Sequence, residues 1–218
     1  MSTWISKGGA PRVAAGALAL ALAGCVATGT SGTRAVTVSS GAVTVAGPPG
    51  YCIDRAAARD GASGAFVLFG TCAALTGSRA AGQPARPAVL TASVGRPAAE
   101  GTNLVANLPA LSAFFKSTPG RAALSGSGDA ATVKVEKVSQ SGDVLYIRLS
   151  DSAAAAGQAV EPGQWRALTA FRGRIVTLAV LSPASAPLSS AEQRAVLDQF
   201  VARMRRANAA AGGAAASG

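Results

Sequence analysis

The segment at residues 50–75 limits the fold most, because it holds two short apolar runs and two of the three cysteines. One run, residues 51–53, contains Cys52, and the other, residues 65–69, precedes Cys72. Runs this short, with a polar, glycine-containing connection between them, are typical of paired strands. A Cys52–Cys72 disulfide would close a loop of about 20 residues and contribute about 3 kcal/mol. The alternative is two buried free thiols.

A positively charged start and an apolar run precede Cys25. Lys7 and Arg12 are the only charged residues among the first 33, and residues 13–23 are small and apolar. This run is too short to span a bilayer and is typical of a signal-peptide core. It ends in Leu22-Ala23-Gly24-Cys25, which resembles the lipobox of bacterial lipoproteins at all four positions.

The lipobox resemblance implies that residues 1–24 are removed and that Cys25 carries a lipid on its sulfur and an acyl chain such as palmitate on its amino group. The protein would then be anchored in the cell envelope and face the periplasm. Val26 occupies the position where aspartate favours inner-membrane retention in enteric bacteria, so the outer membrane is expected rather than the inner.

Ordinary secretion is the alternative to lipidation, with cleavage at Ala21-Leu22-Ala23. That cleavage would leave an odd number of cysteines in the mature chain. Lipidation takes Cys25 and leaves Cys52 and Cys72 to pair, which an oxidising envelope favours.

The strongly basic charge favours anionic partners. The formal net charge is +10, and removal of Lys7 and Arg12 leaves +8 (10 − 2). Anionic lipid or an acidic envelope polymer would suit such a surface. The arginines are dispersed without interleaved aromatic residues, so nucleic acid is not expected. Arginine enrichment through nucleotide composition is the alternative explanation and requires no partner. The sequence identifies no protein partner.

The mature chain divides into three parts by composition. Residues 25–41 are rich in Thr, Ser and Gly and predict a flexible tether. Residues 42–207 predict a single domain, and residues 208–218 predict a disordered Ala/Gly/Ser tail. Beyond Cys25, no apolar run reaches the length of a membrane-spanning helix.

Alternating apolar residues predict the strands of an antiparallel sheet. Besides residues 51–53 and 65–69, strands are expected at residues 42–45 and 88–94. Two further hairpins are expected, at residues 133–149 and 164–181. The turn of the second includes Arg172-Gly173-Arg174 and could hold two or three residues.

Two segments have helical periodicity. In residues 103–117, Pro109 is tolerated only near a helix start, so Asn107 is expected as the cap. Residues 189–206 begin with a capping box of Ser189 and Glu192. Their expected core stripe is Val196, Leu197, Phe200, Val201 and Met204, and Arg203, Arg205 and Arg206 are expected near the helix C-terminus.

This element order predicts an α+β domain: an antiparallel sheet with a helix near the middle and a C-terminal amphipathic helix packed on it, stapled by one disulfide. The order of elements resembles that of Mog1/PsbP-like domains. The resemblance is one of topology, without a shared motif.

No residue pattern predicts a catalytic, cofactor or metal site. The chain has no histidine, which excludes Ser-His-Asp and Cys-His machinery and His-ligated zinc. Glycine–serine segments at residues 29–32 and 125–128 lack the context of a nucleophile elbow or a phosphate loop. Turn capping explains four aspartates that could otherwise form a carboxylate pair or a calcium site: Asp54, Asp60, Asp143 and Asp151.

These observations predict a lipid-anchored envelope protein whose domain binds or scaffolds rather than catalyses. One alternative is a histidine-free enzyme that uses a Ser/Lys or carboxylate pair. The other is a carrier of an anionic small molecule or lipid, with a groove lined by Trp165, Arg166, Arg172 and Arg174.

Overall fold

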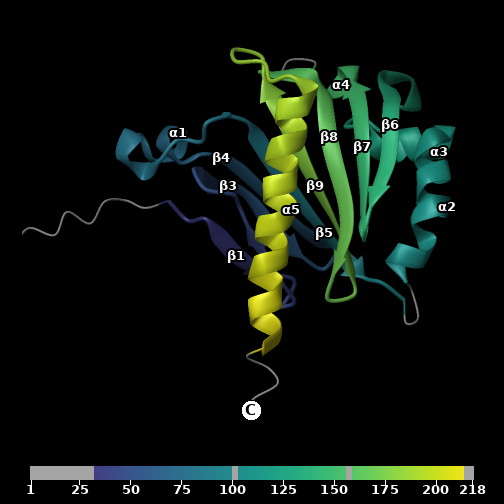
Figure 1. Ribbon diagram of the computed structural model, residues 1–218, viewed down its shortest axis with the longest axis horizontal. Helices are drawn as coiled ribbons and strands as arrows, with labels where there is room; N and C mark the ends of the chain where they lie inside the picture. Colours follow the sequence, from purple (N-terminus) through teal and green to yellow (C-terminus); the bar gives the residue numbers. More distant parts are fainter. Residues whose placement is uncertain (1–31, 100–102, 156–158, 214–218) are drawn as a thin grey trace, which may run out of the picture.

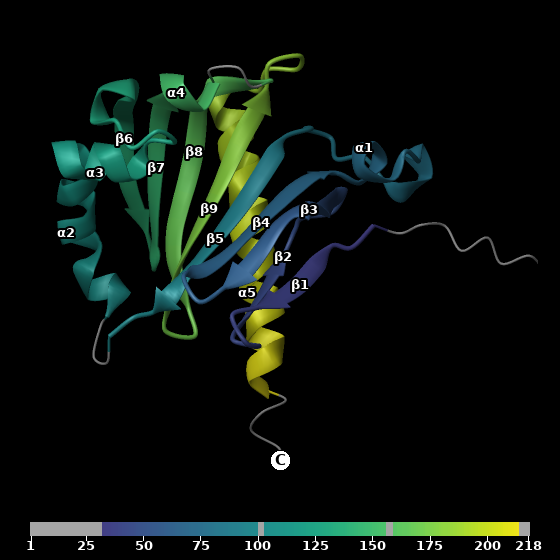
Figure 2. The same ribbon diagram turned by 180° about the vertical axis from the view of Figure 1, so that it is seen from behind.

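A computed structural model describes residues 32–99, 103–155 and 159–213 of the chain (Figures 1 and 2). The leader, Cys25 and the first seven residues of the expected tether lie outside these residues. The fold is α+β, as predicted, and its centre is a seven-stranded antiparallel sheet. In sheet order, the strands are β3 (Tyr51–Gly61), β4 (Gly64–Thr71), β5 (Val89–Pro97), β9 (Arg174–Pro183), β8 (Val160–Phe171), β7 (Val144–Asp151) and β6 (Val133–Ser141).

Helices pack on both faces of this sheet. The long helix α5 (Ser190–Gly213) crosses one face, and α2 (Leu104–Lys116) and α3 (Thr118–Leu124) cover the β6 end of the other (Figures 1 and 2). Short helical turns join the remaining elements: α1 (Cys72–Thr76), η1 (Arg79–Ala81), η2 (Ala130–Thr132) and α4 (Ser152–Ala155). Among the described helices, none is long and apolar enough to cross a membrane.

The expected disulfide is confirmed. Cys52 in β3 is bonded to Cys72, the first residue of α1, with their Cα atoms 4.7 Å apart. The intervening chain turns back at residues 62 and 63, so that Gly61 pairs with Gly64. The staple therefore joins α1 to the edge strand of the sheet.

The folded domain begins earlier than expected, because residues within the expected tether form a strand. β1 (Ala35–Val38) pairs with β2 (Val43–Ala46) in a separate two-stranded sheet. Val38 on β1 and Val43 and Val45 on β2 are buried in the core beneath α5. A polar, glycine-containing composition suggested a linker, but burial of alternate valines outweighs it.

The hairpin between β1 and β2 turns through an uncommon backbone conformation. Ser39 and Ser40 have φ angles of 57° and 56°, values that L-residues other than glycine seldom adopt. The Asp60 carboxylate accepts a hydrogen bond from the Ser39 backbone N–H, at 2.9 and 3.1 Å to its two oxygens. A contact from the neighbouring β3 thus holds this turn in place.

The two expected later hairpins are confirmed as β6–β7 and β8–β9. The second has a two-residue turn, because Phe171 pairs directly with Arg174. Its central residues Arg172 and Gly173 have φ angles of 50° and 69°, as a type I′ turn requires.

The middle helix begins before the expected position. Asn103, not Asn107, caps α2 by accepting a hydrogen bond from the Ala106 N–H at 3.2 Å. Pro109 therefore lies inside the helix rather than in its first turn. Burial of Leu108 and Phe115 against the sheet retains the helix despite the proline.

The C-terminal helix has the predicted capping box and core stripe. The Ser189 hydroxyl accepts from the Glu192 N–H at 3.3 Å, while Glu192 accepts from the Ser189 N–H at 2.9 Å. The stripe is buried at all its predicted positions: Val196, Leu197, Phe200, Val201 and Met204.

The helix continues into the expected disordered tail, as far as Gly213. Asn208 explains this extension: its side-chain amide donates to the Thr44 carbonyl at 2.9 Å and accepts from the Thr44 N–H at 3.0 Å. Arg203, Arg205 and Arg206 consequently lie within the helix rather than at its end. Arg205 pairs with Asp143 instead.

Candidate functional site

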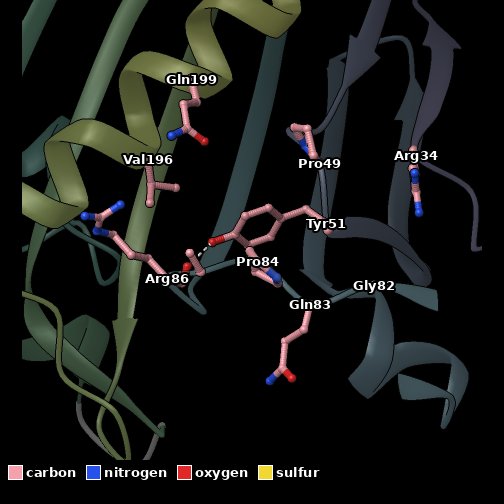
Figure 3. A pocket seen from close by; sticks show the side chains of 11 residues that line it. Arg34, Pro49, Tyr51, Gly82, Gln83, Pro84, Arg86, Val196 and Gln199 are labelled. Carbon is pink, nitrogen blue, oxygen red and sulfur yellow. Dashed lines mark hydrogen bonds between the residues drawn. The ribbon is translucent and has the colours of Figure 1, made fainter. Parts of the chain in front are cut away.

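A cleft of about 440 Å³ lies between α5 and the segment that joins η1 to β5. We call it the Tyr51 cleft (Figure 3). Its lining is Arg34, Pro49, Gly50, Tyr51, Gly82, Gln83, Pro84, Ala85, Arg86, Val196 and Gln199. The cleft thus joins residues from the chain before β1, the start of β3, the loop before β5, and α5.

Close backbone packing shapes the floor of the Tyr51 cleft. Gly50 has a φ of 84°, and a Cβ atom there would lie only 2.7 Å from the backbone nitrogen of Pro84. A larger residue at position 50 would therefore force the strand and the loop apart. Gly50 also accepts a hydrogen bond from the Cys72 N–H at 2.8 Å, which links the floor to the disulfide.

Tyr51 is the central side chain of the cleft, and only 2% of it is exposed. Its hydroxyl donates to the backbone carbonyl of Arg86 at 2.5 Å, a bond drawn in Figure 3. Burial raises the pKa of this phenol, because the phenolate would lose its solvation. Tyr51 is therefore a neutral anchor between β3 and the loop, and is not suited to act as a base.

Besides Tyr51, the polar side chains of the lining are two arginines and two glutamines. Arg34 and Arg86 lie on opposite sides of Tyr51, and Gln199 projects from α5 (Figure 3). No residue of this lining carries a carboxylate. The Arg34 guanidinium donates to the Ala81 carbonyl at 3.0 Å and leaves other N–H groups available for a ligand.

Arg86 has one acidic neighbour outside the lining. Its Nε lies 3.6 Å from Glu192 Oε1, and both side chains are 42% exposed. Hydrogen bonds from Ser189 lower the pKa of Glu192, and Arg86 adds a smaller electrostatic contribution. Because exposed ion pairs of this kind are weak, the pair leaves Arg86 able to exchange Glu192 for an anionic ligand.

This arrangement suits anion binding better than catalysis. Guanidinium groups present several N–H donors to carboxylate or phosphate oxygens, and they do not release a proton in proteins. Tyr51, Pro49, Pro84 and Val196 supply apolar surface beside these donors.

The predicted ligand-facing residues do not come together. Trp165 is buried in the core beneath α5, where its indole N–H donates to the Ser190 carbonyl at 3.0 Å. Arg166 is the next residue on β8, so it points to the opposite face of the sheet. Arg172 is exposed at the β8–β9 turn, and Arg174 donates to the Gly95 carbonyl at 3.0 Å.

Arg166 is the most desolvated of these arginines. Burial lowers its pKa, and Asp151 acts in the opposite direction. Its Nε donates to the Gln164 side-chain oxygen at 3.2 Å. Since Trp165 faces the other way, the two residues cannot line the same groove.

Of the four aspartates considered for a metal site, Asp54 caps its own turn, while the other three bond residues that are distant in the sequence. Asp54 accepts from the Ala56 N–H, Asp60 from the Ser39 N–H, and Asp151 from the Gly126 N–H and the Thr132 hydroxyl. Within the described residues, no three His, Cys, Asp or Glu side chains gather closely enough to hold a metal ion.

A second cavity, also of about 440 Å³, lies over β4, β5 and β9 on the sheet face opposite α5. Phe66 and Ile175 supply its larger apolar side chains, and Arg59 supplies a charge. Figure 2 shows this part of the sheet with no described helix in front of it. The cavity includes none of the four predicted ligand-facing residues.

Sequence reasoning missed the Tyr51 cleft because its residues are distant in the chain. The sequence holds a partial signal for it: Pro48-Pro49-Gly50 is typical of a change of chain direction, and the Pro/Gly-rich residues 77–87 are typical of a surface loop. Nothing in either segment indicated that they would meet each other and α5.

No protein family model matches the chain, and no curated protein matches it. A solved structure of a mutant of protein Mog1 is similar, with a TM-score of 0.39 and 12% sequence identity. The similarity covers 80% of this chain and 93% of that chain. This weak neighbour agrees with the topological resemblance to Mog1/PsbP-like domains, but a likeness of this size carries no argument about function.

Proposed function

We propose that the protein is a lipid-anchored cell-envelope protein whose domain binds an anionic ligand, without catalysing a reaction, in the Tyr51 cleft. The observation that carries this proposal is the lining of the cleft, which combines Arg34 and Arg86 with apolar surface and has no carboxylate. The ligand class is a small molecule with a phosphate or carboxylate group.

The chemistry of the lining supports binding over the alternative of a histidine-free enzyme. A general base near neutral pH needs a pKa close to the working pH. Burial moves the pKa of Tyr51 away from that range, and arginine stays protonated. The groove expected for a carrier does not form, because Trp165 and Arg166 lie on opposite faces of the sheet, so we assign the anionic ligand to the Tyr51 cleft instead.

The proposed location at the membrane is inferred from the leader sequence. The motif Leu22-Ala23-Gly24-Cys25 predicts an acylated Cys25, and anchoring by several acyl chains is durable. Intact mass of the membrane-extracted protein tests it. A chain that starts at Cys25 and carries acyl chains is expected, and an unlipidated chain would contradict the anchor.

Calorimetric titration of the detergent-extracted protein with inorganic phosphate and with pyrophosphate tests whether the cleft binds anions. Charge-assisted hydrogen bonds contribute about 1.5–3 kcal/mol. We therefore expect Arg34→Gln and Arg86→Gln each to weaken binding and raise the Kd by about tenfold or more.

Arg172→Gln is the matched control, since it removes an equal charge at the exposed β8–β9 turn. It should leave the Kd unchanged. Equal effects of all three substitutions would attribute binding to net charge and exclude a site in the Tyr51 cleft.

A further inference from the structure

The described chain begins in direct contact with α1. A Cβ atom at Gly32 would lie 2.6 Å from the Cys52 Sγ and 3.2 Å from the Thr76 Cγ2. Gly32 therefore packs against the disulfide and the last residue of α1. In Figures 1 and 2, α1 projects from the molecule on the side from which the chain enters β1.

The distance from this entry point to the proposed lipid anchor is limited by covalent geometry. Seven residue steps separate Cys25 from Gly32 (32 − 25). Even a fully extended chain of that length spans at most about 25 Å. A compact domain of this size is about 40 Å across, estimated from a radius of gyration of about 16 Å. The anchor therefore keeps the end of the domain that carries α1 nearer to the bilayer than the end that carries α2 and α3.

The surface beside the entry point has the composition of a membrane contact. Leu75 on α1 is 41% exposed, an unusual position for a large apolar side chain in this domain. Arg34 and Arg79 are also exposed. Two segments on this side, residues 32–34 and 72–87, contain three arginines and no Asp or Glu, and one of these arginines, Arg86, pairs with Glu192 of α5. Clustered cations near an anionic leaflet strengthen membrane attachment.

We propose that Leu75, Arg34 and Arg79 form a membrane-contacting surface, the α1 surface. Leu75 enters the interfacial region of the bilayer, while the arginines bind the anionic headgroups of phospholipids. The inference rests on the proposed lipid anchor at Cys25, because the anchor brings this surface to the bilayer. Arg34 also lines the Tyr51 cleft, so the cleft opens close to the headgroups.

Tryptophan quenching in vesicles tests the α1 surface. The full lipidated protein carrying Leu75→Trp is reconstituted in phosphatidylcholine vesicles that contain phosphatidylglycerol and lipid with brominated acyl chains. We expect bromine to quench the new tryptophan and its emission to shift to shorter wavelength. Trp165 is 6% exposed and gives the same background in every variant.

Phe114→Trp is the matched control, because Phe114 is also 41% exposed and belongs to α2, which lies at the opposite end of the molecule from α1 (Figures 1 and 2). Its fluorescence should be unaffected by brominated lipid. Ala74→Trp, at an exposed neighbour on α1, replaces Leu75→Trp if that variant does not fold. Equal quenching at positions 75 and 114, or quenching at neither position on α1, would overturn the inference.

The charge requirement is tested separately. Arg79→Glu should reduce quenching of the α1 tryptophan at least twofold in vesicles with phosphatidylglycerol. It should leave phosphate binding unchanged, since Arg79 is not part of the cleft lining. Unchanged quenching would contradict the proposed binding of anionic headgroups by Arg79.

The lipid anchor and the α1 surface fail in different ways. Protein that lacks acyl chains by mass and does not float with the vesicles contradicts the anchor. Protein that floats with the vesicles while its α1 tryptophan remains unquenched contradicts the α1 surface alone.

Discussion

The two faces of the central sheet are covered in different ways. On one face, a single long helix, α5, and the β1–β2 hairpin enclose a cluster of 24 buried residues. On the other, the short helices α2 and α3 enclose a cluster of eight, at the β6 end of the sheet. We refer to these as the α5 side and the α2–α3 side.

The α5 side has more extensive local and long-range support. Its helix begins with a complete capping box and is held near its end by Asn208, which bonds the backbone of β2. The helix of the α2–α3 side contains Pro109 and leaves Phe114 exposed. We infer that the α5 side is the more stable part of the domain.

The candidate site belongs to the α5 side. Tyr51 and Val196 line the cleft and are members of the α5-side cluster. No residue of the cleft lining comes from α2 or α3. Ligand binding should therefore depend on packing beneath α5 and tolerate changes beneath α2 and α3.

Truncation of one buried phenylalanine on each side should give the largest difference in stability between the two sides. Phe200 is fully buried and packs edge-on against Phe69, with ring centroids 5.4 Å apart. Phe200→Ala should lower the free energy of unfolding by about 3–5 kcal/mol. Phe115→Ala should cost less, because that ring is 7% exposed and its aromatic neighbour Phe114 is exposed to solvent. Urea unfolding measures both losses, and equal losses would contradict the ranking of the two sides.

Removal of the disulfide should cost about 3 kcal/mol in urea unfolding, as expected for a loop of about 20 residues. Cys52→Ala combined with Cys72→Ala makes this change. Hydrogen exchange should then increase in β3 and α1, which the staple joins, and in the loop before β5, where Pro84 packs against Gly50. Exchange in α2 and α3 should not change. A uniform increase across the domain would show that the two sides unfold as one unit.

Alkaline pH should destabilise the α5 side, where both tyrosines of the chain are buried. Burial raises the pKa of Tyr51 and of Tyr146, and Asp198 contributes to the rise at Tyr146. Above pH 10 the unfolded state loses phenolic protons that the folded state retains, so stability falls as the pH rises. The decline for each buried phenol is at most about 1.4 kcal/mol per pH unit.

Urea unfolding between pH 8 and about pH 11 measures this decline, with Tyr51→Phe as the comparison variant. The variant should lose less stability above pH 10 than the wild-type protein does. Identical profiles would exclude Tyr51 as a source of the pH dependence.

Features with a local signal were predicted well from the sequence. The capping box of Ser189 and Glu192 places all its partners within four residues, so the pattern alone indicates the helix start. The alternation of apolar and polar residues on either side of a short turn predicted the β6–β7 and β8–β9 hairpins, because the paired residues are again close in the sequence. The disulfide followed from a count of three cysteines, with Cys25 assigned to lipid.

Features that depend on distant contacts were missed. β1 lies in a Thr/Ser/Gly-rich segment and forms because Val38 is buried beneath a helix more than 150 residues away. The extension of α5 past Ala207 depends on the bond between Asn208 and Thr44, which are 164 residues apart. Local propensity carries no information about either contact.

By itself, the sequence determined the α+β class, the hairpins, the cysteine pairing and the start of the last helix, because each depends on short-range geometry or a simple count. Only the tertiary structure decided which arginines share a site. Alternation along β8 sends Trp165 and Arg166 to opposite faces, whereas the packing of β3, the loop before β5 and α5 brings Arg34 and Arg86 to Tyr51. Residue type selects what a site can bind, and the path of the chain selects which residues form it.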